Sequence, residues 1–246
     1  MKKEMRGKEP LLLSIESATR VMSVAVLAGE ALLAEISTHD ERVHSERLLP
    51  AIDQLLRIAG LSLGEIEAFA ISIGPGSFTG LRIGLATLKG LALGSDRPSV
   101  AVPTLGALTL AAAGAAGPVA ALLDARRDEV YAACLAGPGE IGKPLVPDAV
   151  LTAEELAAAL PPSCIVVVGE GAEKVASAAA DRAAHRIALL PAALGRTRAF
   201  HTGLLGARLL AAGAGQRSED LVPRYVRRAE AEVRFTGERF EGAGGS

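Results

Sequence analysis

The chain has 246 residues, which is enough for one large domain or two modest domains, each with its own core. Half of the residues are apolar, but only 3% are aromatic and Trp is absent, so the core must be built from Ala, Leu, Val and Ile. A formal net charge of −2 argues against a strongly basic surface that would bind nucleic acid tightly without a partner.

The cysteines and the N-terminal residues both give information about the cellular compartment of the protein. Cys134 and Cys164 lack metal-ligand spacing and lie in apolar, strand-like runs, which indicates buried free thiols in a reducing compartment. Residues 1–10 are charged and lack a signal-peptide core, and no apolar run reaches the roughly 20 residues of a membrane span. We therefore expect a cytoplasmic protein with no membrane segment.

The first half of the chain alternates strand-like runs with amphipathic stretches. Its first three strands are joined by links short enough for antiparallel hairpins. The predicted elements are strands over 11–16, 21–27 and 31–37, a helix over about 44–59, a strand over 68–73, a helix ending near 92, a strand over 99–102 and a helix over about 104–113. Their order is βββαβαβα.

The second half repeats this order more loosely. Its predicted elements are strands over 118–124, 129–135 and 147–151, a helix over 154–160 behind a Thr152–Glu155 capping box, a strand over 164–168, a helix over 171–180, a strand over 186–190 and a helix over about 197–212. Two tandem units of this kind describe the α/β fold of sugar kinases, heat-shock ATPases and actin, the actin-like (ASKHA) fold. We expect an N-terminal lobe over 10–103, a C-terminal lobe over 104–212 whose last helix can pack back on the first lobe, and an extension over 213–246 with a disordered tail.

The run from Ile73 to Gly84 is the most distinctive stretch of the sequence. It reads Ile-Gly-Pro-Gly-Ser-Phe-Thr-Gly-Leu-Arg-Ile-Gly, a strand end, a tight turn and a helix start that Ser77 can cap. Free N–H groups at such a turn can hold an anion, although the spacing fits neither a P-loop nor a dinucleotide fingerprint. Gly76, Gly80 and Gly84 recur on one helix face, so either the chain's own sheet or a partner's helix approaches that face closely.

The first hairpin is a candidate nucleotide site, because actin-like folds bind phosphates there. Glu16 could hold a cation and Ser17 or Thr19 a phosphate oxygen, and the alternative is an ordinary polar turn. The candidate nucleotide or anion site therefore comprises Glu16, Ser17, Gly74, Gly76 and Ser77.

Two charged segments have two interpretations each. Asp124–Glu129 is either a solvated hairpin turn or a charged lip facing a cleft between lobes. Arg224, Arg227, Arg228 and Arg234 form either a solvated extension or a contact with an acidic partner or a tRNA backbone. No pair of histidines stands at helical metal-ligand spacing, so no metal site is predicted.

Four motifs together resemble the bacterial TsaB (YeaZ) family. They are Gly74-Pro-Gly-Ser-Phe-Thr-Gly-Leu-Arg-Ile-Gly84 continued by Lys89-Gly-Leu-Ala92, His44-Ser-Glu-Arg-Leu-Leu-Pro50, Asp124-Ala-Arg126 with Glu129-Val-Tyr131, and Pro223-Arg-Tyr225-Val-Arg227. The first motif is highly specific. The other three are weak alone, but they support the resemblance together because they occur in the family's order along residues 10–230. The first strand departs from the family's usual Asp-Thr, because it ends in Glu16-Ser17.

The resemblance implies a non-catalytic scaffold or activating subunit of the complex that forms N6-threonylcarbamoyladenosine at position 37 of tRNAs decoding ANN codons. In that family the catalytic partner is the paralogue TsaD, which transfers threonylcarbamoyl from its adenylate to tRNA, and the small ATPase TsaE joins the complex. The resemblance also implies a homodimer when alone and tRNA contact only through the complex. It implies no intrinsic cofactor, with any ATP or ADP held at the complex interface.

The family associates through the first two helices of the N-terminal lobe. The contact residues that this implies here are His44, Leu48, Leu49, Ile52, Gly80, Leu81, Arg82, Gly84 and Leu85. Gly84→Leu is therefore predicted to break the complex while leaving the chain folded. The catalytic subunit's His-x-x-x-His metal motif corresponds here to Thr104 and Leu108, and because Leu cannot ligate and Thr ligates iron or zinc poorly, no metal or catalytic residue is predicted.

Two alternatives belong to other classes of protein. An actin-fold ATPase or small-molecule kinase would use Glu16 and the turn over 74–77, and metal-dependent ATP hydrolysis by the isolated chain would favour it. A metalloprotease-like hydrolase is disfavoured by the missing histidine pair. Zinc or iron bound to the chain in a stoichiometric amount would favour this alternative.

Overall fold

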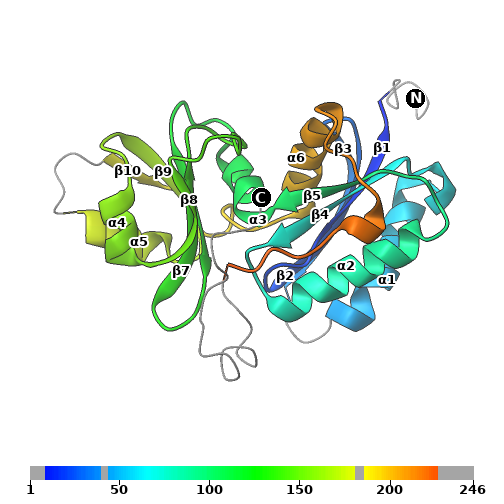
Figure 1. Ribbon diagram of the computed structural model, residues 1–246, viewed down its shortest axis with the longest axis horizontal. Coiled ribbons are helices and arrows are strands. Elements are labelled where there is room, and N and C mark those ends of the chain that lie inside the picture. The colour runs from blue at the N-terminus through cyan, green and yellow to red at the C-terminus, as the bar shows by residue number, and fades with distance from the viewer. Residues whose placement is uncertain (1–8, 40–43, 181–185, 227–246) are drawn as a thin grey trace.

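The computed structural model describes residues 9–39, 44–180 and 186–226, which form two five-stranded sheets with helices around them (Figure 1). The first sheet has the strand order β3-β2-β1-β4-β5, and the second has the matching order β8-β7-β6-β9-β10. In each sheet the first three strands pair antiparallel and the last two continue parallel to the first. The predicted tandem order and the α/β fold class are confirmed.

The elements follow the predicted segments closely. The first sheet contains β1 (Leu11–Glu16), β2 (Val21–Ala28), β3 (Ala31–His39), β4 (Ala68–Gly74) and β5 (Ser99–Pro103). The second contains β6 (Val119–Asp124), β7 (Glu129–Leu135), β8 (Val146–Thr152), β9 (Cys164–Gly169) and β10 (Arg186–Leu189). The helices are α1 (His44–Ala59), α2 (Phe78–Ala92), α3 (Thr104–Thr109), α4 (Ala153–Ala159), α5 (Ala172–Ala179) and α6 (Ala199–Ala211). The helix expected over 104–113 is shorter, because a 3-10 turn over Leu110–Ala112 follows α3.

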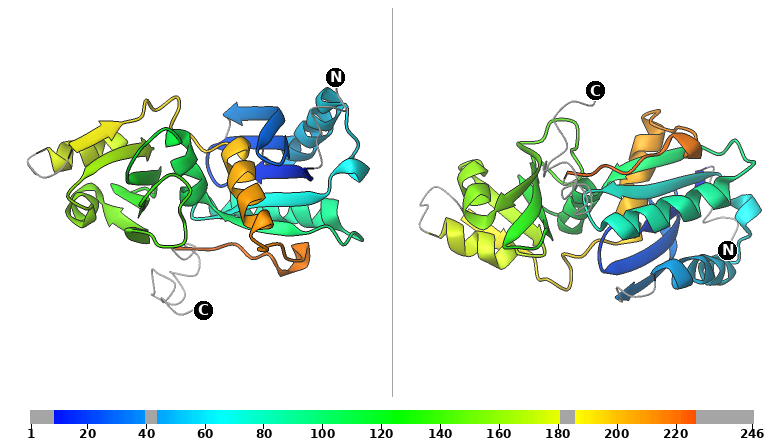
Figure 2. Two further views of the ribbon diagram at one scale, coloured as in Figure 1. Left: turned by 90° about the horizontal axis from the view of Figure 1, so that it is seen from above. Right: turned by 60° about the horizontal axis from the view of Figure 1, so that its bottom comes forward.

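Helices cover both faces of each sheet, so each sheet is buried between two apolar layers. α1 and α2 lie on one face of the first sheet, where Leu48, Leu55 and Phe69 are fully buried. α6 covers the opposite face of that sheet (Figure 2). α4 and α5 cover one face of the second sheet and α3 packs on the other. α3 and α6 also contact each other, so they connect the two halves of the molecule.

The segment after α6, which we call the C-terminal strap (residues 213–226), returns across the first sheet towards the second (Figure 1). Gln216 and Ser99 exchange two backbone hydrogen bonds of 2.8 and 3.0 Å, and Leu221 is only 1% exposed. The Arg224 guanidinium lies 3.0 Å from a carboxylate oxygen of Asp148 on β8. The strap is therefore anchored to the rest of the chain at Gln216, Leu221 and Arg224, whereas most of its described residues are exposed. Arg227, Arg228 and Arg234 lie outside the described residues.

None of the helices within the described ranges is both long enough and apolar enough to cross a membrane.

Candidate functional site

The turn between β1 and β2 is closed around its own polar groups. One oxygen of the Glu16 carboxylate accepts a 2.7 Å hydrogen bond from the Ala18 N–H, and the other accepts one of 3.1 Å from the Thr202 hydroxyl. Burial raises the pKa of Glu16 to about 7, although these hydrogen bonds oppose the shift. The Ser17 hydroxyl donates to the Gly80 carbonyl at 2.9 Å. Glu16 and Ser17 are both fully buried and hydrogen-bonded within the chain, so neither side chain is accessible to a nucleotide in this conformation.

The turn between β4 and α2 uses its N–H groups internally as well. The Gly74 N–H donates to the Thr104 hydroxyl at 3.0 Å, and the Ser77 N–H donates to the Ala18 carbonyl at 2.6 Å. The Ser77 hydroxyl accepts a 3.2 Å hydrogen bond from the Gly80 N–H, which confirms Ser77 as the cap of α2. The Gly74 and Ser77 amides are therefore engaged within the chain and are not free to bind an anion in this conformation.

The glycine face of α2 packs against the chain's own first hairpin. A Cβ added at Gly76 would overlap the Ala18 carbonyl, and one at Gly80 would overlap the Ser17 carbonyl. A Cβ at Gly84 would overlap the Ser17 hydroxyl and lie 3.2 Å from the Ile71 side chain. The expectation that these glycines meet a partner's helix is therefore wrong. Gly84→Leu would disturb the fold itself and cannot serve as a selective test of partner binding.

The other predicted contact residues divide into buried and exposed groups. Leu48, Ile52, Leu81 and Leu85 are at most 5% exposed, and all but Leu81 belong to the apolar cluster between the helices and the first sheet. Leu49 is 53% exposed. His44 begins α1, but its side chain lies outside the description.

Arg82 lies on the exposed side of α2 and contacts two aromatic rings. Its guanidinium stacks on the Phe78 ring, 3.8 Å from the ring centroid, and donates to the Tyr225 hydroxyl at 3.1 Å. α1 and α2 are neighbours, and we call their exposed stripes together the α1/α2 surface. It comprises Leu49, Asp53, Arg57, Thr79, Arg82 and Ala86.

Thr104 and Leu108, the positions that the family resemblance matches to the catalytic subunit's metal histidines, are both buried and engaged within this chain. Thr104 is fully buried, and its hydroxyl accepts the hydrogen bond from Gly74. Leu108, also fully buried, packs with Val119 and Val168 under the second sheet. Across the residues that are described, His, Cys, Asp and Glu side chains form no group of three or more suited to a metal ion. Cys134 is a buried free thiol as predicted, and burial raises its pKa to about 11.

The turn between β6 and β7 is charged and conformationally unusual. Arg126, Arg127 and Asp128 have φ angles of 65°, 55° and 60°, a left-handed run that non-glycine residues rarely adopt. The Asp124 carboxylate accepts a 2.9 Å hydrogen bond from the Arg126 N–H, and Asp128 pairs with Lys174 of α5 at 2.9 Å. Asp124, Arg126, Arg127 and Asp128 are all exposed. Arg127 also interacts with another group in the chain.

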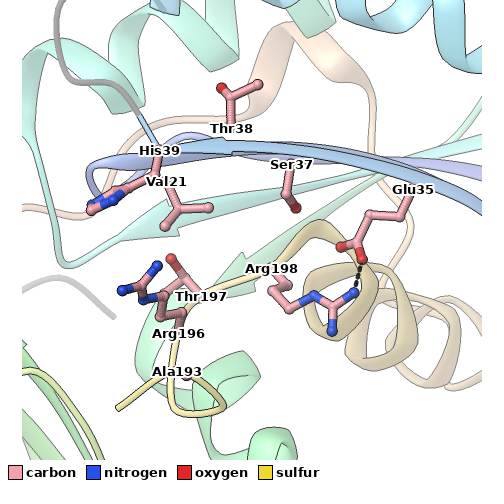
Figure 3. A pocket seen from close by; sticks show the side chains of 9 residues that line it. All are labelled: Val21, Glu35, Ser37, Thr38, His39, Ala193, Arg196, Thr197 and Arg198. Carbon is pink, nitrogen blue, oxygen red and sulfur yellow. Dashed lines mark hydrogen bonds and ion pairs between the residues drawn. The ribbon is translucent and has the colours of Figure 1, made fainter.

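A pocket of about 370 Å³ lies between the ends of β2 and β3 and the segment that precedes α6 (Figure 3). The segment, residues 190–198, joins β10 to α6, and we call it the connector. Sequence reasoning missed this pocket. The Arg196-Thr197-Arg198 run before the last helix was a visible signal, but only the fold brings it beside β3.

The fold defines the chain as an actin-like α/β protein. The ethanolamine utilization protein EutJ from Carboxydothermus hydrogenoformans has a TM-score of 0.53 at 13% identity, and the match covers 80% of this chain and 90% of that one. At that identity the likeness shows the fold alone.

Other comparisons define the family. A family model described as TsaD, tRNA N6-adenosine threonylcarbamoyltransferase, matches residues 31–235. YeaZ from Pseudomonas aeruginosa has a solved structure with a TM-score of 0.73 and 32% identity, and the match covers 88% of this chain and 99% of that one. A Haemophilus influenzae protein named tRNA threonylcarbamoyladenosine biosynthesis protein TsaB is 42% identical over 123 residues, 49% of this chain and 51% of that protein. The chain belongs to the tRNA N6-adenosine threonylcarbamoyltransferase family and, within it, to the TsaB/YeaZ group.

The similarity to curated proteins is concentrated in part of the sequence. The chain spans about half the length of the curated relatives that it matches, with 51% and 52% of the Haemophilus influenzae and Escherichia coli proteins covered.

Proposed function

We propose that this chain is a non-catalytic subunit of the complex that forms N6-threonylcarbamoyladenosine at position 37 of ANN-decoding tRNAs. It binds the catalytic paralogue TsaD and stabilises the conformation in which TsaD transfers threonylcarbamoyl to tRNA. The names of its TsaB relatives and its family membership support this role. With a net charge of −2, the chain contributes little to tRNA affinity, so tRNA is bound by the complex as a whole.

The observation that carries the proposal is the side-chain chemistry at Thr104 and Leu108. A metal-dependent transferase needs ligands there, but the Thr104 hydroxyl is engaged by Gly74 and Leu108 is part of an apolar core. A metal ion at this place would require both side chains to be replaced. This favours a supporting role over catalysis by the chain itself.

The α1/α2 surface is the proposed contact with TsaD. Its residues project outward from two helices whose inner faces are fixed on the first sheet, so the surface is held rigidly before binding. Arg82 and the aromatic rings that it contacts are residue types that often dominate binding energy at protein interfaces. Without TsaD the same surface forms a homodimer. TsaE joins the TsaD complex, and any ATP or ADP is held at the interface of that complex.

The test is reconstitution of the reaction with purified components and threonylcarbamoyl-adenylate. Modified adenosine in tRNA is quantified by mass spectrometry after reactions with this chain alone, with TsaD and TsaE, and with all three. We expect no product from this chain alone and a large increase in rate when it is added to TsaD and TsaE. Product from this chain alone, or an unchanged rate on its addition, would contradict the proposal.

A further inference from the structure

The pocket beside β3 has walls from two separate parts of the chain. One wall is formed by the start of β2 and the end of β3, including Val21 and His39, and the other by the connector (Figure 3). Its volume of about 370 Å³ lies within the range of small-molecule sites. A 2.7 Å hydrogen bond between the hydroxyls of Thr197 and Thr19 holds the connector against the first hairpin, so the pocket is formed before any ligand binds.

Among the described residues that line the pocket, the one acidic side chain is already neutralised. The Glu35 side chain is only 6% exposed and pairs with the Arg198 guanidinium. Its other oxygen accepts hydrogen bonds from the Phe200 N–H at 2.9 Å and from the Ser23 hydroxyl at 3.1 Å. Glu35 and Arg198 therefore cancel each other's charge and fix that side of the pocket.

The opposite end of the pocket carries donors without acceptors. Arg196 and His39 come from the two different walls and lie towards the same end in the view of Figure 3. Within the part of the chain that the structure describes, neither side chain has a hydrogen bond or ion pair. A guanidinium offers five N–H donors and no acceptor, and an imidazole offers at least one donor. The described lining residues thus give this end of the pocket a net positive charge, which suits an anionic group.

We propose that this pocket binds a small organic phosphate, with the phosphate group at the Arg196–His39 end. A phosphate has enough oxygens to accept from both side chains at once, and arginine binds it in a bidentate manner. Val21 and Ala193 give the remainder of the pocket apolar surface for the body of the ligand. None of the residues in the candidate nucleotide site (Glu16, Ser17 and the turn over 74–77) lines this pocket, so it is a separate site.

Binding would also affect the arrangement of the molecule. The connector leads from the second sheet into α6, whereas β3 is the edge strand of the first sheet. A ligand held by Arg196 and His39 would therefore add a further link between the two halves of the chain, beside the contacts of α3 with α6 and of Arg224 with Asp148.

The test is isothermal titration calorimetry of the full chain at low ionic strength with ribose 5-phosphate and, as the uncharged match, ribose. We expect one site per chain with a Kd of about 1 mM or tighter for ribose 5-phosphate, and no saturable binding of ribose. Arg196→Gln should weaken binding at least about tenfold, because it removes a charge-assisted contact. Arg217→Gln, which neutralises another exposed arginine in the C-terminal strap, away from the pocket lining and the α1/α2 surface, should bind as the wild type does.

Three results would overturn the proposal. They are the absence of saturable binding of ribose 5-phosphate, equal affinity for ribose, and an equal loss in Arg217→Gln, which would indicate non-specific attraction of anions. Arg196 is exposed, so its variant is expected to unfold at the wild-type temperature, and this is checked by thermal denaturation. TsaD takes no part in the experiment, so a failure here leaves the proposed function unaffected.

Discussion

Glu16 and His201 are buried titratable side chains whose pKa values move in directions that have opposite effects on stability. Burial raises the pKa of Glu16 from 4.5 to about 7. His201 lies on α6 beside Thr202, the residue that donates to Glu16. Burial, with a smaller contribution from the Arg198 charge and against that of Glu35, lowers the pKa of His201 from 6.5 to about 4. Both side chains are therefore held neutral in the folded chain near pH 6.

The two shifts produce opposite slopes of stability against pH. Between pH 4.5 and 7 the folded chain keeps a proton on Glu16 that the unfolded chain has lost, so its contribution to stability falls as pH rises. Between pH 4 and 6.5 the unfolded chain binds a proton on His201 that the folded chain does not, so this contribution falls as pH decreases. Because the windows overlap, the two contributions largely cancel from pH 4.5 to 6.5.

We predict that Glu16→Gln exposes the pH dependence of stability due to His201, which the contribution of Glu16 masks in the wild type. The free energy of unfolding of the variant relative to the wild type should increase by about 3 kcal/mol between pH 4.5 and 7, because glutamine does not ionise. Denaturant unfolding measured at intervals from pH 4 to 8 provides the comparison. If the free energies of unfolding of the two proteins changed in parallel with pH, the raised pKa of Glu16 in the folded chain would be contradicted.

At the scale of the element, α2 contains glycines with contrasting surroundings. A Cβ at Gly80 would overlap the backbone of Ser17, whereas a Cβ at Gly90 would meet nothing within 4 Å. Gly80→Ala is therefore expected to lower the free energy of unfolding by roughly 1–3 kcal/mol, because backbone must move. Gly90→Ala should raise it by up to about 1 kcal/mol, since alanine is the better helix former. Equal effects of the two substitutions in denaturant unfolding would refute the packing of α2 on the first hairpin.

Elements with local causes could be predicted from the sequence. The Thr152–Glu155 capping box is one example, because both of its hydrogen bonds, 3.2 and 2.8 Å, join residues three apart. The glycine spacing on α2 likewise predicted a close neighbour, but it could not say whether that neighbour was the chain's own hairpin or a partner. Leu48 and Leu81 were assigned to an interface through the family resemblance, and they are buried within the chain, because an apolar helix face indicates burial without indicating what covers it.

At the scale of the whole molecule, the features that sequence reasoning missed join residues far apart in the chain. Glu35 and Arg198 meet only after α6 has packed on the first sheet. Arg224 and Asp148 meet because the C-terminal strap crosses from the first sheet to the second. The strap also places Tyr225 beside Arg82, which adds an aromatic ring to the α1/α2 surface. Such pairings depend on the tertiary fold, so spacing and composition carry no signal for them.

The proposed pairing of this chain with TsaD through the α1/α2 surface can be tested by light-scattering mass measurement after size exclusion. The chain is measured alone and mixed with TsaD from the same genome, together with Leu49→Asp and Leu145→Asp. Leu49 is 53% exposed on α1, and Leu145, at 47%, is a matched control beside the second sheet. Both variants are expected to fold.

We predict that the wild type and Leu145→Asp each give a mixed peak with the mass of one chain of each kind. Leu49→Asp should bind at least about tenfold more weakly, because a charge is buried at the centre of the contact. No mixed peak for the wild type would contradict the proposed partnership. A mixed peak that survives Leu49→Asp undiminished would contradict the proposed surface.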